Sequence, residues 1–288
     1  MKILLYIIAC SLATFSVVAG DNRAKEVKKT KAVKKVELPK NIRLIIGQDK
    51  TKNYYIRVRA IHNLPTNLPN EQIEAFYKFL YTRLEKQNLK DLEFNALKNE
   101  LVLELMKQKV KPKELAGHLV KMYQDKTFDP TWRDYCVQFF GKWYAAAPRN
   151  KARKEMLKNL WIAATETNNS CGGTAVTMLI RMLDTGDVDR KKLSKAAYKV
   201  LTAKDSVLPN KISSLQVCAE LKNAKALPIA RQIMKSNAHK ILKMSAIAAI
   251  GMLGDRSDLP MLYELSKSTD IRSRGPAKAA IKKINKRH

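Results

Sequence analysis

The chain has 288 residues, of which 45% are hydrophobic and 28% charged, a balance typical of a folded protein rather than a disordered one. Its 55 Lys and Arg residues outnumber the 26 Asp and Glu residues, so the formal net charge is +29. Ten Gly, ten Pro and four Cys exclude a collagen-like, a proline-rich low-complexity or a disulfide-dense small protein. Composition therefore indicates a folded, strongly basic protein and leaves its chemistry open.

The first twenty residues have the pattern of a secretory signal peptide. Lys2 precedes an apolar run of about 18 residues, a length that also suits a membrane span. The small residues Val18 and Gly20 occupy the −3 and −1 positions of a cleavage site, and polar residues begin at Asp21. We therefore expect residues 1–20 to be cleaved from an exported protein, periplasmic or extracellular. A retained N-terminal membrane anchor is the alternative.

Signal cleavage leaves three cysteines, so at least one thiol stays unpaired within a monomer. Cys136 and Cys218 lie in apolar helical runs, where a free cysteine usually behaves as a small buried hydrophobe. Cys171 precedes two glycines and has no His near it in sequence, so a nucleophilic role is not favoured. A lipoprotein-type cleavage at Cys10 would leave too short an apolar region before it.

Residues 21–52 are predicted to form a basic flexible linker. The segment 21–40 carries a net charge of +5 and few large apolar residues. Residues 41–52 contain a short apolar run that is too isolated for its secondary structure to be assigned. It is compatible with a strand or with a turn packed on the first helix.

Residues 53–288 are predicted to be helical throughout. Apolar residues recur at three- and four-residue spacing, as in the run from Ile73 to Leu84. No convincing alternation of apolar and polar residues follows residue 53. Helix starts are marked by capping residues or by proline in the first turn, at Asn70-Glu71, Lys111-Pro112, Asp129-Pro130, Pro209-Asn210 and Ser257-Asp258. The fold class is therefore all-α.

The C-terminal helices repeat at a nearly fixed period. Segment 214–228 aligns without a gap on segment 246–260, and both end in Leu-Pro. Segment 246–253 aligns in the same way on 277–284, and a looser copy lies at 175–187. A period of about 30 residues with two helices per unit predicts an α-solenoid.

One of these repeats resembles a known family. The sequence IAAIGMLGD from Ile247, DLPML from Asp258 and DIR from Asp270 closely resembles a HEAT repeat of the short bacterial kind. The resemblance implies a right-handed α-solenoid of antiparallel HEAT-like helix pairs over residues 53–288. It is clearest over residues 212–286.

The same resemblance assigns structural roles to the acidic and basic residues at the repeat junctions. In the family, the Asp of an Asp-x-Arg pair caps a helix and the Arg bonds to neighbouring carboxylates or carbonyls. Residues 129–133 look like a second junction of this kind with two extra residues. The residues expected in structural junction roles are Asp129, Arg133, Asp270 and Arg272.

Enzyme signatures are absent from the sequence. The four histidines have no metal-ligand spacing, and the Cys171-Gly172-Gly173 segment lacks the spacing of a phosphate loop. We therefore predict no catalytic residue, no metal and no cofactor, and expect a protein that is not an enzyme. Because a solenoid can assemble a site from distant repeats, the alternative is a cell-envelope enzyme, or a lyase-like accessory subunit, with its site in the concave groove.

Three tryptophans, Trp132, Trp143 and Trp161, fall close together in the sequence and form a candidate aromatic surface. Trp132 and Trp143 follow helical spacing with Tyr135 and Phe139, which favours a place in the core. Aromatic residues interleaved with cations also stack on sugars or bases. One branch of DNA glycosylases with HEAT-like repeats clamps damaged DNA in this way, but the export signal argues against a genomic nucleic acid partner.

The sharpest charge feature is the C-terminal segment 272–288, which carries seven cations and no acid. The residues that repeat every four positions on one face of this predicted helix are Arg274, Lys278, Lys282 and Lys286. A solvated polar cap on the open end of a solenoid is one interpretation. The other is a docking surface for an anionic partner.

Together these features predict an exported, non-catalytic scaffold that binds a protein or an anionic polymer of the envelope. Solenoids present extended surfaces, which suit such partners. Forty lysines against fifteen arginines weaken the case for bidentate phosphate recognition. Peripheral contact with a membrane surface is compatible with the charge.

Overall fold

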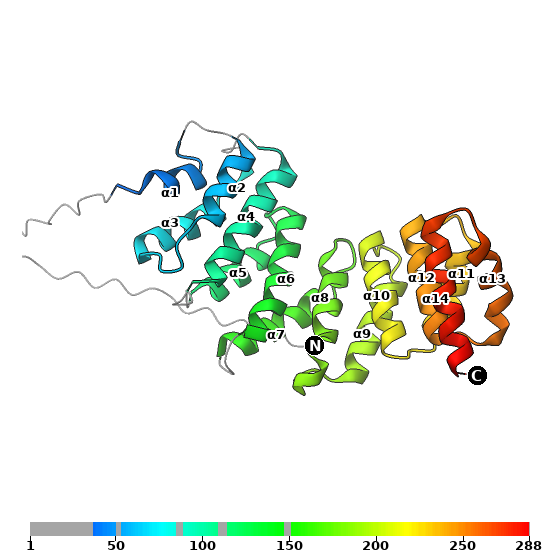
Figure 1. Ribbon diagram of the computed structural model, residues 1–288. Helices are drawn as coiled ribbons and strands as arrows, with labels where there is room; N and C mark the ends of the chain where they lie inside the picture. The colour runs from blue at the N-terminus through cyan, green and yellow to red at the C-terminus, as the bar shows by residue number, and fades with distance from the viewer. Residues whose placement is uncertain (1–36, 50–52, 85–88, 109–113, 147–150, 288) are drawn as a thin grey trace, which may run out of the picture. The chain divides into compact units, whose positions relative to one another are not determined.

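The computed structural model describes residues 37–49, 53–84, 89–108, 114–146 and 151–287. The predicted signal peptide, residues 1–20, lies outside the described residues, as does most of the predicted linker. From Leu38 onward the chain belongs to one unit. Within the described residues, regular structure consists of fourteen α-helices and two 3₁₀ turns without a strand (Figure 1), which confirms the all-α prediction.

The helices follow one another along the unit from the blue to the red end of Figure 1. The first eight are α1 (Lys40–Ile45), α2 (Tyr54–His62), α3 (Asn70–Leu80), α4 (Asp91–Met106), α5 (Leu115–Gln124), α6 (Pro130–Ala146), α7 (Lys151–Ala163) and α8 (Cys171–Ile180). After a 3₁₀ turn at Leu183–Thr185 the next four are α9 (Arg190–Thr202), α10 (Leu208–Glu220), α11 (Ala226–Lys235) and α12 (Lys240–Leu253). A second 3₁₀ turn at Arg256–Asp258 leads to α13 (Leu259–Lys267) and α14 (Ile271–Arg287).

The predicted capping chemistry starts several of these helices. Asp129 precedes α6, and its Oδ1 accepts hydrogen bonds from the backbone amides of Thr131 at 2.8 Å and Trp132 at 3.3 Å. Asp189 caps α9 in the same way, and Pro209 occupies the first turn of α10. A side-chain oxygen at this position satisfies amides that have no partner inside the helix.

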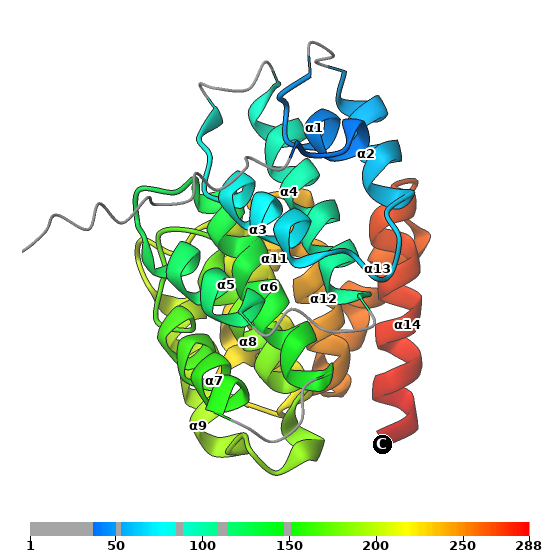
Figure 2. The ribbon, with the colours of Figure 1, turned by 90° about the vertical axis from the view of Figure 1, so that its left-hand side faces the viewer.

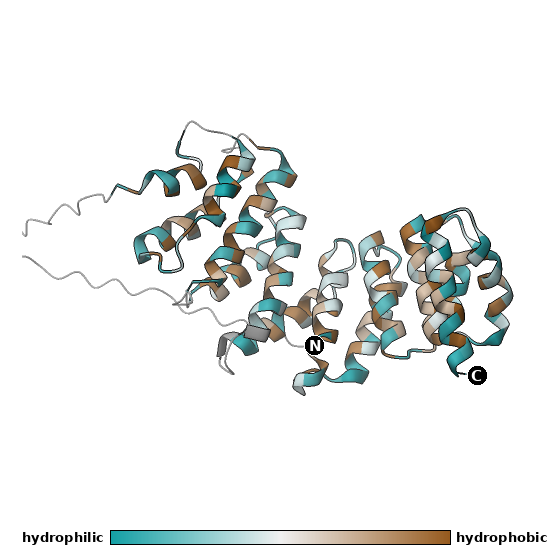
Figure 3. Ribbon diagram, in the orientation of Figure 1, coloured by the Kyte–Doolittle hydropathy of each residue, from teal (hydrophilic) through white to brown (hydrophobic). Residues whose placement is uncertain are grey.

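Even-numbered helices pack against one another in a row, from α2 through α4, α6, α8, α10 and α12 to α14. Each odd-numbered helix packs against an even-numbered neighbour. The core lies between the two sets, and most helices therefore carry both apolar and polar residues (Figure 3). Helix α14 lies at the end of the row, in contact with α12 and α13 (Figure 2).

The predicted linker extends too far toward the C-terminus. Residues 40–45, inside the expected linker, form helix α1, whose Ile42 and Ile45 are fully buried. Arg57 of α2 donates to the carbonyl oxygen of Ile45 from Nε at 3.0 Å. The local sequence offers only a short apolar run here, and it is packing on α2 that makes this short helix stable. The helical unit therefore begins at Leu38 rather than at residue 53.

Three helices in the C-terminal part of the chain start at nearly regular intervals. Helices α10, α12 and α14 begin at Leu208, Lys240 and Ile271, so their starts are almost evenly spaced in sequence. Small residues allow close packing here, because a Cβ atom built on Gly251 of α12 would lie 2.7 Å from the Cα atom of Ala280. In the described part of the chain, no helix is both long and apolar enough to cross a membrane.

Candidate functional site

The four cations predicted on the last helix lie on the surface of α14. Arg274, Lys278, Lys282 and Lys286 are exposed, while the intervening Ala277, Ala280 and Ile284 are buried. Of the four, Lys286 lines a groove. The amphipathic pattern of this helix is therefore the one that its sequence predicts.

The groove beside α14 has a volume of about 340 Å³. Its lining residues are Lys222, Met252, Lys283, Lys286 and Arg287. Two of these cations donate hydrogen bonds to carbonyl oxygens at the end of α12. Arg287 bonds to Gly251 at 2.8 Å and to Gly254 at 2.7 Å. Lys222 bonds to Met252 at 3.2 Å. Cations at the C-terminal end of a helix oppose the negative end of its dipole.

A larger groove of about 550 Å³ lies along α9. It is lined by five cations together with Ser194, Tyr198, Leu221 and Asn223. The cations are Arg190, Lys191, Lys195, Lys199 and Lys225. Lys191, Lys195 and Lys199 lie one helical turn apart and are all exposed, so their ammonium groups follow a single face of α9.

The turn between α10 and α11 contributes residues to both grooves. Leu221, Asn223 and Lys225 of this turn line the larger groove, and Lys222 lines the smaller one. Lys222 has a φ of 58°, the left-handed conformation that reverses the chain here. No carboxylate lines either groove in the described part of the chain. We call the nine cations that line the two grooves the basic edge.

Sequence reasoning placed the candidate anion-binding residues on the last helix and did not single out the cations of α9. The sequence does contain the pattern, because Lys191, Lys195 and Lys199 recur every four residues in a helix without an acidic residue. What the sequence does not show is that the turn after α10 brings Lys225 to the same groove. Asp189 directly precedes Arg190 in sequence, but its carboxylate accepts a hydrogen bond from the Lys192 amide and caps α9.

The junction residues are Arg133, which is buried, and Asp129, which is exposed, and both make hydrogen bonds to neighbouring elements. Arg133 Nε donates to the carbonyl oxygen of Tyr123 at 2.8 Å, and its terminal nitrogen lies 2.9 Å and 3.0 Å from the two carboxylate oxygens of Glu166. Asp129, besides capping α6, accepts a hydrogen bond from Asn95 of α4 at 2.9 Å. This network therefore connects α4, α5, α6 and the segment before α8.

Glu166 is the acceptor at the centre of this network. Burial would raise the pKa of its carboxyl, but hydrogen bonds from Lys126, Asn169 and Tyr123 and the charge of Arg133 together lower it to about 2. The carboxylate is therefore ionised at neutral pH although its side chain is only 13% exposed.

The predicted junction at Asp270 and Arg272 is simpler. Asp270 Oδ1 accepts a hydrogen bond from the backbone amide of Arg272 at 3.1 Å, at the start of α14. Arg272 is exposed. The charged contact in this region comes instead from Arg231, whose Nε and terminal nitrogen each lie 2.8 Å from a carboxylate oxygen of the buried Asp258.

The candidate aromatic surface is not formed as proposed. Trp132 is completely buried and Trp143 is 7% exposed, because both lie on the faces of α6 that pack against neighbouring helices. Trp161 is half-buried, and its ring lies 4.2 Å from the Lys192 ammonium group. The core placement that helical spacing favoured is the one observed for Trp132 and Trp143.

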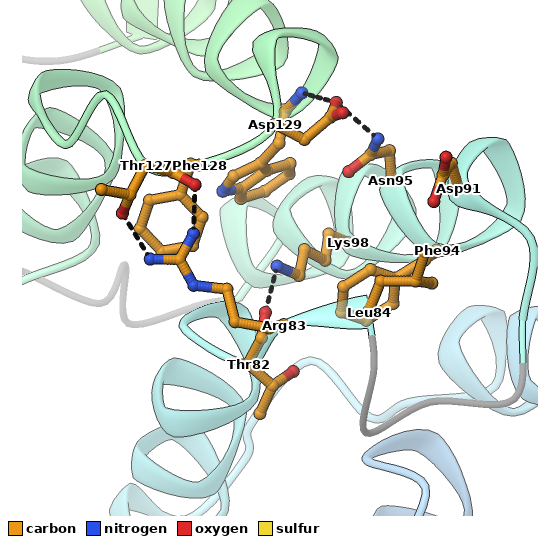
Figure 4. A pocket seen from close by; sticks show the side chains of 11 residues that line it. Thr82, Arg83, Leu84, Asp91, Phe94, Asn95, Lys98, Thr127, Phe128 and Asp129 are labelled. Carbon is orange, nitrogen blue, oxygen red and sulfur yellow. Dashed lines mark hydrogen bonds between the residues drawn. The ribbon is translucent and has the colours of Figure 1, made fainter.

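A pocket of about 260 Å³ lies between α4 and the segments that precede α4 and α6 (Figure 4). Its central group is the ammonium nitrogen of Lys98, which donates to the carbonyl oxygen of Thr82 at 2.9 Å. The same nitrogen lies 4.3 Å from the ring centre of Phe94, 5.2 Å from Trp132 and 5.4 Å from Phe128. Three aromatic rings therefore surround one lysine.

Lys98 is 2% exposed and has no carboxylate within ion-pair distance among the described residues. Burial lowers the pKa of Lys98 to about 7. At the mouth, Arg83 donates to the carbonyl and hydroxyl oxygens of Thr127 and lies 4.2 Å from the Phe128 ring (Figure 4). Nothing in the sequence pointed to this pocket, because Lys98 looks like an ordinary helix-surface lysine.

The three cysteines among the described residues, Cys136, Cys171 and Cys218, are buried and unpaired. Burial raises the pKa of the Cys171 and Cys218 thiols to about 12 and that of Cys136 higher still. Among the described residues, no three His, Cys, Asp or Glu side chains come together in a way that would hold a metal ion.

The fold and its surfaces define an all-helical protein with a basic edge and a separate buried-lysine pocket. Searches against protein-family models, curated proteins and solved structures find no match to this chain.

Proposed function

We propose that this protein is an exported, non-catalytic scaffold that binds an anionic polymer through the basic edge. The observation that carries the proposal is the pair of grooves to which the α10–α11 turn contributes, lined by nine cations and no carboxylate of the described residues. Like charges held together on one surface raise the local potential and attract a polyanion over a Debye length of about 8 Å. An acidic glycan or lipopolysaccharide has the repeated charges that fit such an edge.

The scaffold is proposed to be a solenoid of HEAT-like helix pairs. Three features support this: the row of even-numbered helices, the odd-numbered helices packed against it, and the nearly even spacing of the starts of α10, α12 and α14. In such a row, the C-terminal ends of successive even-numbered helices lie along the same side. The C-terminal ends of α10, α12 and α14 all contribute residues to the basic edge or its hydrogen bonds.

Export is proposed from the sequence alone, on the charged start, apolar run and small residues of positions 1–20. It directs the choice of partner, because the anionic polymers met outside the cytoplasm are those of the envelope. Contact with anionic lipid headgroups would use the same cations.

The test compares two triple variants of the mature protein on immobilised heparin, a sulfated glycan used as the polyanion. Replacing Lys191, Lys195 and Lys199 with Gln is expected to weaken binding roughly tenfold at low salt, since each exposed ionic contact contributes about 0.2–1 kcal/mol. The matched control replaces three exposed lysines outside the edge with Gln, Lys78, Lys121 and Lys142. Both variants lose the same net charge, and both are checked for folding by circular dichroism.

A larger loss for the α9 variant than for the control supports a located binding surface. Equal losses mean that net charge alone drives retention, which contradicts the basic edge as a site. A third variant, with Lys278, Lys282 and Lys286 replaced by Gln, measures the share of the last helix. Since only Lys286 of these lines a groove, we expect its effect to lie between the other two.

A further inference from the structure

The pocket around Lys98 has no role in the basic edge, and its composition is unusual for a helix junction. Two other junctions also use a buried cation on a carbonyl at the end of the preceding odd-numbered helix: Arg57 on Ile45 and Arg133 on Tyr123. At the α3–α4 junction the cation is a lysine instead, bonded to Thr82. An arginine keeps its charge when buried, whereas a lysine amine readily loses its proton in an apolar site.

The surroundings of Lys98 leave the amine without the partner that would keep it charged. The charged or titratable groups that act on it are the buried Cys136, the cation Arg83 and the carboxylate Asp129. Asp129 is already occupied by Asn95 and by two backbone amides at the start of α6. The amine therefore exists in large part as the free base near neutral pH, the form that acts as a nucleophile.

The pocket also offers a hydrogen-bond donor without an acceptor. Trp132 lines the pocket, its ring centre lies 5.2 Å from the Lys98 nitrogen, and its buried indole N–H has no hydrogen-bond partner among the described residues. A buried donor of this kind costs free energy unless something accepts its proton. The Trp132 N–H is therefore a polar group in the wall of the pocket that the described residues do not satisfy.

We propose that Lys98 is a nucleophilic amine that forms an imine with a small apolar or aromatic aldehyde bound in this pocket. The aromatic walls formed by Phe94 and Phe128 fit an apolar ligand body, and the volume of about 260 Å³ limits its size. The lone pair of the Lys98 nitrogen attacks the carbonyl carbon and the C=O π bond breaks, and a proton passes from that nitrogen to the carbonyl oxygen to give a carbinolamine. Loss of that hydroxyl group with a proton from nitrogen gives the C=N bond and one water molecule. The step needs no oxidant or reductant.

The test traps the imine in the folded protein. Benzaldehyde is the probe, sodium cyanoborohydride reduces any imine to a stable benzylamine, and peptide mass spectrometry gives the modified fraction of each lysine. Lys107, just past the end of the same helix and 63% exposed in its side chain, is the internal reference. At pH 7 we expect Lys98 to be labelled at least about tenfold faster than Lys107, because an ordinary lysine is almost fully protonated there.

Three further results decide between selective chemistry and general reactivity. The rate of labelling at Lys98 should rise with pH and level off above about 7, where its free base dominates. The variant Lys98→Arg should lose the fast-labelled site while Lys107 keeps its rate. Equal labelling of both lysines, or labelling of Lys107 with Lys98 unmodified in the folded wild-type protein, would overturn the proposal.

Discussion

Helices α1–α8 and helices α9–α14 join their neighbours by different chemistry. In the first group, buried Arg57, Lys98 and Arg133 extend to carbonyl oxygens at or just past the end of the preceding helix, among aromatic side chains. In the second group the core is rich in alanine, and cations such as Lys222 and Arg287 bind helix-end carbonyls from exposed positions.

The difference separates two uses of positive charge. A buried cation has lost its hydration and needs a partner, so it fixes geometry and makes stability depend on pH. An exposed cation keeps its hydration and contributes little to stability, but it adds to the field that an anionic partner meets. The first group is therefore the place to look for pH-dependent chemistry, and the second for polyanion binding.

The largest expected effect comes from removing a buried charge in the first group. Glu166→Gln should lower the free energy of unfolding by about 3 kcal/mol at pH 7, because Arg133 is left buried without its ion partner. Since the pKa of Glu166 lies near 2, below its ordinary value of 4.5, its contribution is full above pH 4.5 and is lost as pH falls toward 2. Urea unfolding at pH 7 and pH 3 measures both.

The control for this variant is Lys126→Gln, which removes an exposed partner of the same carboxylate. It should cost less than about 1 kcal/mol. A loss for Glu166→Gln no larger than that of the control would remove the contrast between buried and exposed charge.

The second effect tests close packing in the C-terminal group. Gly251→Ala should lower the free energy of unfolding by about 2 kcal/mol, because its Cβ atom would lie 2.7 Å from Ala280 on α14. Gly117→Ala in α5 is the matched control, since a Cβ atom there meets nothing within 4 Å. It should instead stabilise the protein by roughly 0.5–1 kcal/mol through helix propensity. Thermal and urea unfolding give both values.

The third effect concerns the buried lysine. The pKa of Lys98 is about 7 in the folded protein against its ordinary value of 10.5, so the unfolded chain binds the extra proton between these pH values. Burial of Lys98 therefore destabilises the protein fully below pH 7, and this penalty disappears as pH rises to 10.5. Lys98→Met should raise the free energy of unfolding at pH 6 by roughly 1–2 kcal/mol.

At pH 10 the same Lys98→Met variant should gain much less, since the wild-type penalty for burying the amine has then largely disappeared. Urea unfolding at the two pH values gives the difference. A gain that is the same at pH 6 and pH 10 would show that packing, and not proton binding, controls this site.

The smallest effect lies in the turn between α10 and α11. Lys222→Gly should stabilise the protein by about 0.5–1 kcal/mol, because glycine adopts the φ of 58° without the steric cost of a side chain. Both variants lose the exposed hydrogen bond from Lys222 to Met252, but Lys222→Ala keeps the steric cost and should therefore be destabilising. Shifts of the unfolding midpoint of opposite sign for the two variants would confirm backbone strain at this turn.

Helix class and several helix starts were within reach of the sequence, because periodicity and capping act over a few residues. Asp129 before α6 and the regular spacing of α10 and α12 are examples. Helix α1 was missed because its stability comes from contacts with α2, which local pattern does not reveal. For Trp132 and Trp143 the sequence favoured a core position but left a surface position open. The packing of α6 against its neighbours decides for the core.

The sequence alone determines that the chain is helical, because helix periodicity and capping act over a few residues. It also determines that the chain is strongly basic, because the charge of +29 is a sum over residues and does not depend on the fold. Where that charge acts depends on tertiary packing. Lys98 and Lys195 are both lysines on helices, yet the packing of α4 against its neighbours buries one among three aromatic rings, while α9 presents the other in an open groove. Desolvation and the proximity of distant residues set their chemistry, and both arise only when helices far apart in sequence meet.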